Sequence, residues 1–118
     1  MSLENKKLME RYHAAWSKGD LQQLQQMLDA KCVTYNLVTS EERGIDFETQ
    51  ACQIWHNSFT DVQVHIQQMV AESDKVSVYW HLTSTHTGEF MDIPATGKQI
   101  VVPGMEINRI KDGKLIEI

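Results

Sequence analysis

Two residue types suited to proton transfer lie in one stretch of the chain, STHTGEFMDIPATGKQIVVPGMEINRIKDGK, which runs from Ser84 to Lys114. The first half of this stretch is typical of a loop built around a small-molecule pocket, and the second half predicts a strand, a turn and a returning strand. His86 and Glu106 are its candidates for acid–base chemistry. A carboxylate in an apolar pocket has its pKa raised by desolvation, whereas the same group on an outer sheet face titrates like an ordinary carboxylate.

The position of Glu106 depends on the strand that carries it. Alternation along a strand places Glu106 and Asn108 on one face and Met105 and Ile107 on the other. Met105 and Ile107 would fill the interior if the alternation simply followed hydrophobicity. The Pro103–Gly104 pair can instead carry a bulge that resets the alternation and turns Glu106 inward.

Helical periodicity dominates the first half of the chain. Leu8, Tyr12, Ala15 and Trp16 are spaced to form one face of a first helix that ends near Gly19. A short second helix with Asp20 as its N-cap and a third helix that Asp46 can cap follow it. The expected inner face of the third helix consists of Phe47, Ala51, Ile54, Trp55, Ser58 and Phe59.

After Asp61 the hydrophobic period changes to two, which predicts strands. Two strands follow on either side of the break AESDK, a third runs from Ile100 to Ile110, and the Asp112–Gly113 pair favours a tight hairpin into residues 115–118. Helices followed by strands predict an α+β fold, with the helices on one face of a curved antiparallel sheet. We expect one domain over residues 1–118.

Composition limits the classes of partner. The chain has 118 residues, 42% of them hydrophobic, and a net charge of −5 with both signs mixed along its length. No basic stripe is available for phosphates, so nucleic acid and anionic membranes are poor partners. Cys32 and Cys52 have neither a CxxC neighbour nor a histidine at metal-ligand spacing, which predicts buried thiols and no metal site. No stretch has the pattern of a signal peptide or a membrane span, and we expect a cytoplasmic protein.

Three segments carry a resemblance to a known family when taken in order: YHAAWSKGDLQQLQQML, a strand with Tyr35 and Asn36, and HTGEFMDIPATGKQIVVPGMEINRIKDGK. Together they resemble the SnoaL-like polyketide cyclases of the nuclear-transport-factor-2-like superfamily, over nearly the whole chain. The resemblance implies a cone of long helix and strongly bent sheet around an apolar cavity, often dimerising through the outer sheet face. A homodimer that binds a small apolar molecule is therefore expected.

Cyclases of this family close a ring by an intramolecular aldol step, without a metal or cofactor. The resemblance places Asn36 at a pocket asparagine, His86 at the histidine of the HTG segment, and Glu106 at a polar position that holds histidine in those cyclases. We therefore predict Glu106 and His86 as catalytic residues. The predicted ligand-binding residues are Asn36, Trp16, Trp55, Phe59, Phe90 and Met105.

The acid of the family cyclases follows the DGK hairpin by several residues, and this sequence stops at Ile118 before that position. Two explanations remain open: a natural short member that has lost the acid, or a sequence cut inside the final strand. Glu106 and Glu117 are the possible substitutes on nearby strands, with Glu117 expected in solvent.

Each candidate also has a structural interpretation. The aromatic residues can be core rather than cavity wall, His86 can hold its loop by a hydrogen bond, and Asn36 can form a turn. Two functions therefore stay open. One is a cofactor-free cyclase or isomerase acting on a small carbonyl compound, and the other is a non-catalytic small-ligand-binding or dimerisation module.

Overall fold

The computed structural model describes residues 2–35 and 42–118 and has the predicted α+β architecture. Its helices are α1 (Ser2–Lys18), α2 (Leu21–Met27) and α3 (Asp46–Ser58). Its strands are β1 (Leu28–Tyr35), β2 (Glu42–Arg43), β3 (Phe59–Glu72), β4 (Lys75–His86), β5 (Gln99–Lys111) and β6 (Lys114–Glu117). Asp20 caps α2 as predicted, because its carboxylate accepts a hydrogen bond from the backbone N–H of Gln23.

The strands form a six-stranded sheet in the order β2-β1-β6-β5-β4-β3. β3, β4 and β5 are a long antiparallel meander, and β6 returns beside β5 after the hairpin at Asp112–Gly113. The sheet is mixed rather than wholly antiparallel, because β1 pairs with β6 in parallel. Backbone bonds between Tyr35 and Ile118 and between Ile118 and Val33 secure this pairing.

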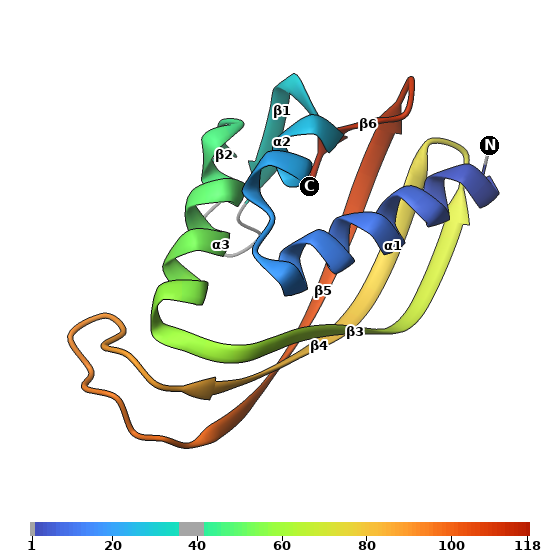
Figure 1. Ribbon diagram of the computed structural model, residues 1–118. Helices are drawn as coiled ribbons and strands as arrows, with labels where there is room; N and C mark the ends of the chain where they lie inside the picture. Colours follow the sequence, from blue (N-terminus) through green and yellow to red (C-terminus); the bar gives the residue numbers. More distant parts are fainter. Residues whose placement is uncertain (1, 36–41) are drawn as a thin grey trace.

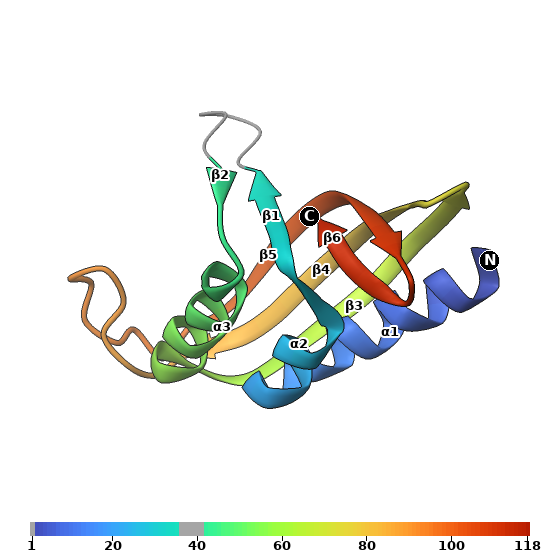
Figure 2. The same ribbon diagram turned by 90° about the horizontal axis from the view of Figure 1, so that it is seen from above.

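The helices cover one face of the bent meander. Figure 1 shows α1 on one side of the meander, with α3 beside one end of the sheet. Figure 2 shows that α1 runs mainly along β3 and that these strands are strongly bent. The core between α1 and the sheet includes Tyr12 and Met9 of α1 and Val76 and Val78 of β4, which are all at most 1% exposed.

The inner face of β5 carries Glu106 without the bulge that the sequence suggested. β4 and β5 stay in register from Lys75 opposite Arg109 to Thr85 opposite Gln99. Simple alternation therefore places Glu106 and the fully buried Asn108 inside, while Met105 and Ile107 are 69% and 62% exposed on the outer face. The prediction that a bulge turns Glu106 inward is therefore wrong, because the regular alternation of the strand already does so.

The inner face of α3 differs from the predicted stripe. Ser58 and Phe59 are buried as predicted, but Phe47 and Ile54 are 37% and 56% exposed. Cys52, which the predicted stripe leaves out, is buried, and Glu48 is partly buried. The predicted stripe rests on the positions of apolar residues alone, whereas the contacts of α3 with α1 determine which side of α3 faces inward. The thiol of Cys52, for example, contacts the backbone carbonyl of Trp16 at 3.7 Å. Ile45 occupies the N-cap position of α3 and makes no side-chain capping bond, so the predicted Asp46 cap is also wrong.

Both cysteines are free thiols in buried positions. Burial raises the pKa of Cys32 to about 12 and that of Cys52 to about 11, which keeps both protonated at neutral pH. Among the described helices, none combines the length and apolar character needed to cross a membrane.

Candidate functional site

A pocket of about 140 Å³ lies between α1, the start of α3 and the inner face of the meander. Its wall combines aromatic and aliphatic side chains with one imidazole and two carboxyl groups. The lining residues are Tyr12, His13, Trp16, Glu48, Val64, Trp80, Leu82 and Glu106.

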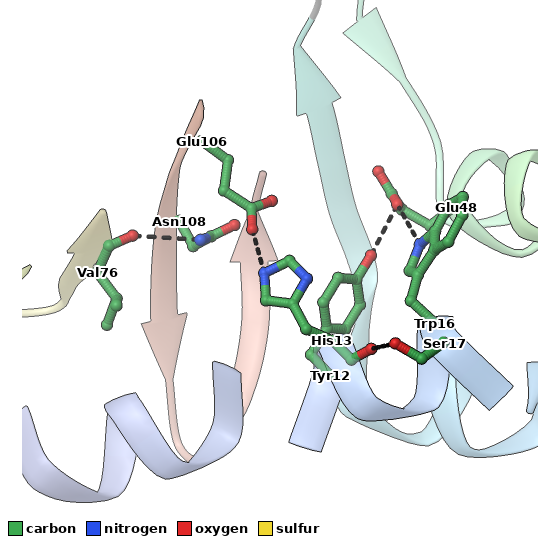
Figure 3. A network of polar contacts seen from close by, with 8 residues as sticks. All are labelled: Tyr12, His13, Trp16, Ser17, Glu48, Val76, Glu106 and Asn108. Carbon is green, nitrogen blue, oxygen red and sulfur yellow. Dashed lines mark hydrogen bonds and ion pairs between the residues drawn. The ribbon is translucent and has the colours of Figure 1, made fainter. Parts of the chain in front are cut away.

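His13 and Glu106 form the closest polar contact in this wall. Nε2 of His13 on α1 lies 2.5 Å from Oε1 of Glu106 on β5. Figure 3 shows the two side chains pointing toward each other. The two side chains are only 6% and 14% exposed, and neither atom has another polar partner in the described part of the chain. An imidazole nitrogen and a carboxyl oxygen at this separation can share one proton in a hydrogen bond. The pair can therefore hold a proton at the pocket wall.

A second carboxyl group, that of Glu48, faces the pocket from α3. The Tyr12 hydroxyl donates to its Oε2 at 2.7 Å and the Trp16 indole N–H reaches the same oxygen at 3.4 Å. The Thr34 hydroxyl donates to Oε1 at 3.4 Å. Burial raises the pKa of Glu48, and the three donors oppose that shift without cancelling it. Burial, together with the charge of Glu48, raises the pKa of Tyr12 well above its ordinary value.

Local sequence explains how α1 supplies three of these side chains. Tyr12 and Trp16 are four residues apart and so share one side of the helix, with His13 adjacent to Tyr12. Tyr12 and His13 are 1% and 5% exposed, which places both on the side of α1 that faces the sheet.

Trp80 forms part of the opposite wall because its neighbour on β5 is glycine. Gly104 pairs with Trp80 across the β4–β5 ladder. A Cβ atom at Gly104 would lie 2.1 Å from Cζ2 of the Trp80 ring, well inside van der Waals contact. The absence of a side chain at Gly104 therefore lets the indole lie over β5.

The structure divides the predicted site residues between several places. Glu106 and Trp16 line the pocket. Met105 is on the outer face, so the prediction that it lines the cavity is wrong, because alternate side chains of a regular strand point to opposite faces. Asn36 lies outside the described residues. Glu117 is bound by Arg109 at 3.0 Å, away from the pocket lining.

The other four predicted residues gather in what we call the aromatic cluster, formed by Trp55, Phe59, His86 and Phe90. Phe59 is its centre: its ring stacks on Trp55 with centroids 4.1 Å apart and on His86 at 5.0 Å, and meets Phe90 edge-on at 5.3 Å. Nδ1 of His86 lies 3.1 Å from the Thr96 hydroxyl, which connects the strand to the following loop. His86 does not line the pocket with Glu106, and its catalytic role stays a prediction.

Sequence reasoning missed His13, Tyr12 and Glu48. Tyr12 belonged to the predicted apolar face of the first helix, so its neighbour His13 could have been considered at the edge of that face. Glu48 gave no such signal, because the predicted stripe placed Phe47 inside instead. Within residues 2–35 and 42–118, no group of three histidine, cysteine or acidic side chains is arranged to hold a metal ion.

Comparison with known proteins identifies the family. The model of the SnoaL-like polyketide cyclases matches residues 6–118. The chain belongs to the SnoaL-like polyketide cyclase family. No curated protein sequence gives a significant match to it.

Solved structures share the fold of this family member. AclR from Streptomyces galilaeus, a candidate hydroxylase, superposes with a TM-score of 0.91 at 28% identity, over 99% of this chain and 73% of AclR. IdmH from Streptomyces antibioticus, a candidate polyketide cyclase, gives a TM-score of 0.84 at 21% identity, over 96% and 87% of the two chains. A protein of Catenulispora acidiphila with a ketosteroid-isomerase-like fold superposes with a TM-score of 0.75 at 14% identity, over 93% of this chain and 80% of that protein. The fold is therefore that of the nuclear-transport-factor-2-like proteins.

Proposed function

We propose that the pocket binds a small carbonyl compound and catalyses proton transfer at carbon without a cofactor, as in an aldol cyclisation or an isomerisation. The observation that carries this proposal is the buried contact between His13 and Glu106 at the wall of the pocket. Membership of the cyclase family supports the same reaction class. A base and its partner must lie within hydrogen-bond reach of the carbon acid, and a pocket wall satisfies that requirement.

The proposed reaction needs no atoms or electrons beyond those of the substrate and the His13–Glu106 pair. The C–H bond next to the carbonyl breaks, its electrons move onto the carbonyl as an enolate, and the proton joins the His13–Glu106 pair. In a cyclisation the enolate carbon forms a bond to a second carbonyl carbon of the same molecule, and the proton returns to the new alkoxide oxygen. In an isomerisation the proton returns to a different carbon atom.

Exchange of hydrogen for deuterium next to a carbonyl tests the proposal without knowledge of the natural substrate. We expect the protein to accelerate deuterium incorporation into the methyl group of acetophenones in D₂O, measured by NMR. Glu106→Gln and His13→Gln should each lower this rate by about 100-fold or more, the usual range for loss of a general base. Glu10→Gln, on the exposed side of α1, is the matched control and should leave the rate unchanged. A rate equal to that in buffer would contradict the proposal.

Non-catalytic binding of a small ligand is the second candidate. It is favoured by the mutual contact of His13 and Glu106, because a buried pair of this kind can serve a structural purpose alone. Binding of a ketone in the pocket without accelerated deuterium exchange would support this alternative.

We also propose a homodimer formed through the outer sheet face. Four apolar side chains on β3 and β5 support it, since they are 62% to 69% exposed: Val70, Val101, Met105 and Ile107. Exposed apolar area of this kind commonly marks an interface. Light scattering at micromolar concentration should give the dimer mass, and Met105→Lys should give the monomer mass. A wild-type monomer would refute the proposal.

A further inference from the structure

The size of the pocket limits what can be enclosed in it. Its volume is about 140 Å³. An engineered apolar cavity of about 150 Å³ in another protein holds one benzene molecule. The side chains of Trp16, Trp80 and Leu82 give the pocket apolar and aromatic walls against which a ring can pack. The enclosed part of a ligand is therefore about one six-membered ring.

The charges in the wall limit the ligand further. Glu48 and Glu106 contribute two carboxyl groups, and His13 is the one described lining residue that can carry a positive charge. None of the described lining residues is a lysine or an arginine. An anionic ligand would lose its water on entry without meeting a surplus of positive charge, which is costly in a buried site. The pocket therefore favours an uncharged ligand.

Glu48 also has an unused capacity to accept a hydrogen bond. A carboxylate offers about four acceptor positions on its two oxygens. Tyr12 and Trp16 occupy two positions at Oε2, and Thr34 occupies one at Oε1. Counting only the residues that the structure describes, one position at Oε1 remains after these three contacts, in a side chain that lines the pocket. A ligand hydroxyl can fill it.

We propose that the pocket selects an uncharged ligand that inserts a single ring and donates a hydroxyl hydrogen bond to Glu48. This inference rests on the proposed function only in taking the pocket as the ligand site. It assigns to Glu48 the recognition of the ligand, whereas proton transfer belongs to the His13–Glu106 pair. Uncharged phenols and enols of one ring are the chemical class that meets all three requirements.

Three one-ring probes separate charge from hydrogen bonding. 3-Hydroxyacetophenone is uncharged and has a hydroxyl donor, 3-methoxyacetophenone lacks the donor, and 3-hydroxybenzoate keeps the donor but is an anion. Binding can be followed by tryptophan fluorescence, because Trp16 and Trp80 line the pocket. We expect 3-hydroxyacetophenone to bind about tenfold or more tightly than either of the others, the scale of one hydrogen bond to a charged group.

Glu48→Gln tests whether this residue sets the ranking. The variant removes a negative charge and half of the acceptor capacity, so the disadvantages of 3-hydroxybenzoate and of 3-methoxyacetophenone should both shrink by about threefold or more. Glu10→Gln is the control and should keep the wild-type ranking. If Glu48→Gln does not fold, the order of affinities of the three probes for the wild-type protein still tests the inference.

Equal or tighter binding of 3-hydroxybenzoate by the wild type, or an unchanged ranking in folded Glu48→Gln, would overturn the inference. Failure of all three probes to bind would overturn it as well. Binding with the expected ranking but without deuterium exchange would refute only the proposed catalysis. Deuterium exchange without the ranking would refute only the role of Glu48.

Discussion

The pocket and the aromatic cluster each contain a buried histidine, but the two histidines have different surroundings. His86 contacts Thr96, only ten positions along the chain, and stacks on Phe59. His13 on α1 contacts Glu106, which comes from the far end of the sequence. The sequence suggested His86 as the acid–base residue, because it lies in a recognisable segment. The comparison teaches that a carboxylate partner brought by the fold, rather than the local segment, makes a histidine suitable for proton transfer.

The two regions also differ in what holds them together. In the aromatic cluster the contacts are between rings, with Phe59 at the centre and 4% exposed. In the pocket wall the contacts are polar ones around a space: the hydrogen bonds to Glu48 and the contact between His13 and Glu106. We therefore expect substitutions in the aromatic cluster to change mainly stability and substitutions around the pocket to change mainly binding or exchange.

The largest effect on stability should come from Phe59→Ala. Loss of a buried phenylalanine leaves a cavity and costs about 3–5 kcal/mol of the free energy of unfolding. Chemical denaturation measures this cost, and Phe47→Ala, at the exposed start of α3 and outside the aromatic cluster, is the control, expected to cost less than about 1 kcal/mol. Deuterium exchange by the folded fraction should stay within about threefold of wild type. Equal costs for the two variants would contradict the burial of Phe59 and the exposure of Phe47.

Gly104→Ala should affect both stability and the pocket. The new methyl group would meet the Trp80 ring at 2.1 Å, so the indole must shift from its place in the pocket wall. We expect a loss of about 1–3 kcal/mol, typical of overpacking, together with weaker binding of 3-hydroxyacetophenone. Gly44→Ala is the control, since a Cβ atom there meets nothing within 4 Å. Unchanged binding and stability in Gly104→Ala would show that Trp80 does not form this wall.

A smaller effect should appear in the pH dependence of stability. Burial raises the pKa of Glu48 in the folded protein above its value in the unfolded chain, about 4.3. The folded state then binds this proton more tightly, so the contribution of Glu48 to the free energy of unfolding falls as pH rises from about 4.3 through the folded pKa. Denaturation between about pH 4 and pH 8 should show wild type losing stability relative to Glu48→Gln. A gain of stability by wild type relative to Glu48→Gln as pH rises would contradict the raised pKa.

The smallest effect on exchange should come from His86→Gln. His86 lies outside the pocket lining, so the rate of deuterium exchange should stay within about twofold of wild type, while His13→Gln lowers it by about 100-fold or more. The loss of the contact with Thr96 should cost about 1 kcal/mol of stability. A loss of exchange in folded His86→Gln equal to that in His13→Gln would restore His86 as a catalytic residue and remove the distinction between the two regions.

The sequence by itself determined the local elements of this protein. The spacing of Tyr12 and Trp16, the cap at Asp20 and the turn at Asp112–Gly113 depend on neighbours within a few residues, and each appears in the structure as the pattern predicts. The α+β class and the alternation of Glu106 against Met105 follow from the same short-range periods. Family resemblance added the cone and drew attention to Glu106.

Only the tertiary structure decided which face of each element points inward. An alternating strand has two possible inner faces, and the packing of α1 against β5 selected the one with Glu106. Likewise, the contacts of Tyr12 and Trp16 with Glu48 span 36 and 32 positions, so no local pattern on α3 could reveal that this glutamate is buried. Hydrophobic periodicity records residue type alone, whereas a buried carboxyl group is stabilised by donors that arrive from distant elements. The polar half of the pocket is for this reason a property of the fold, while the helices and strands that form it are a property of the sequence.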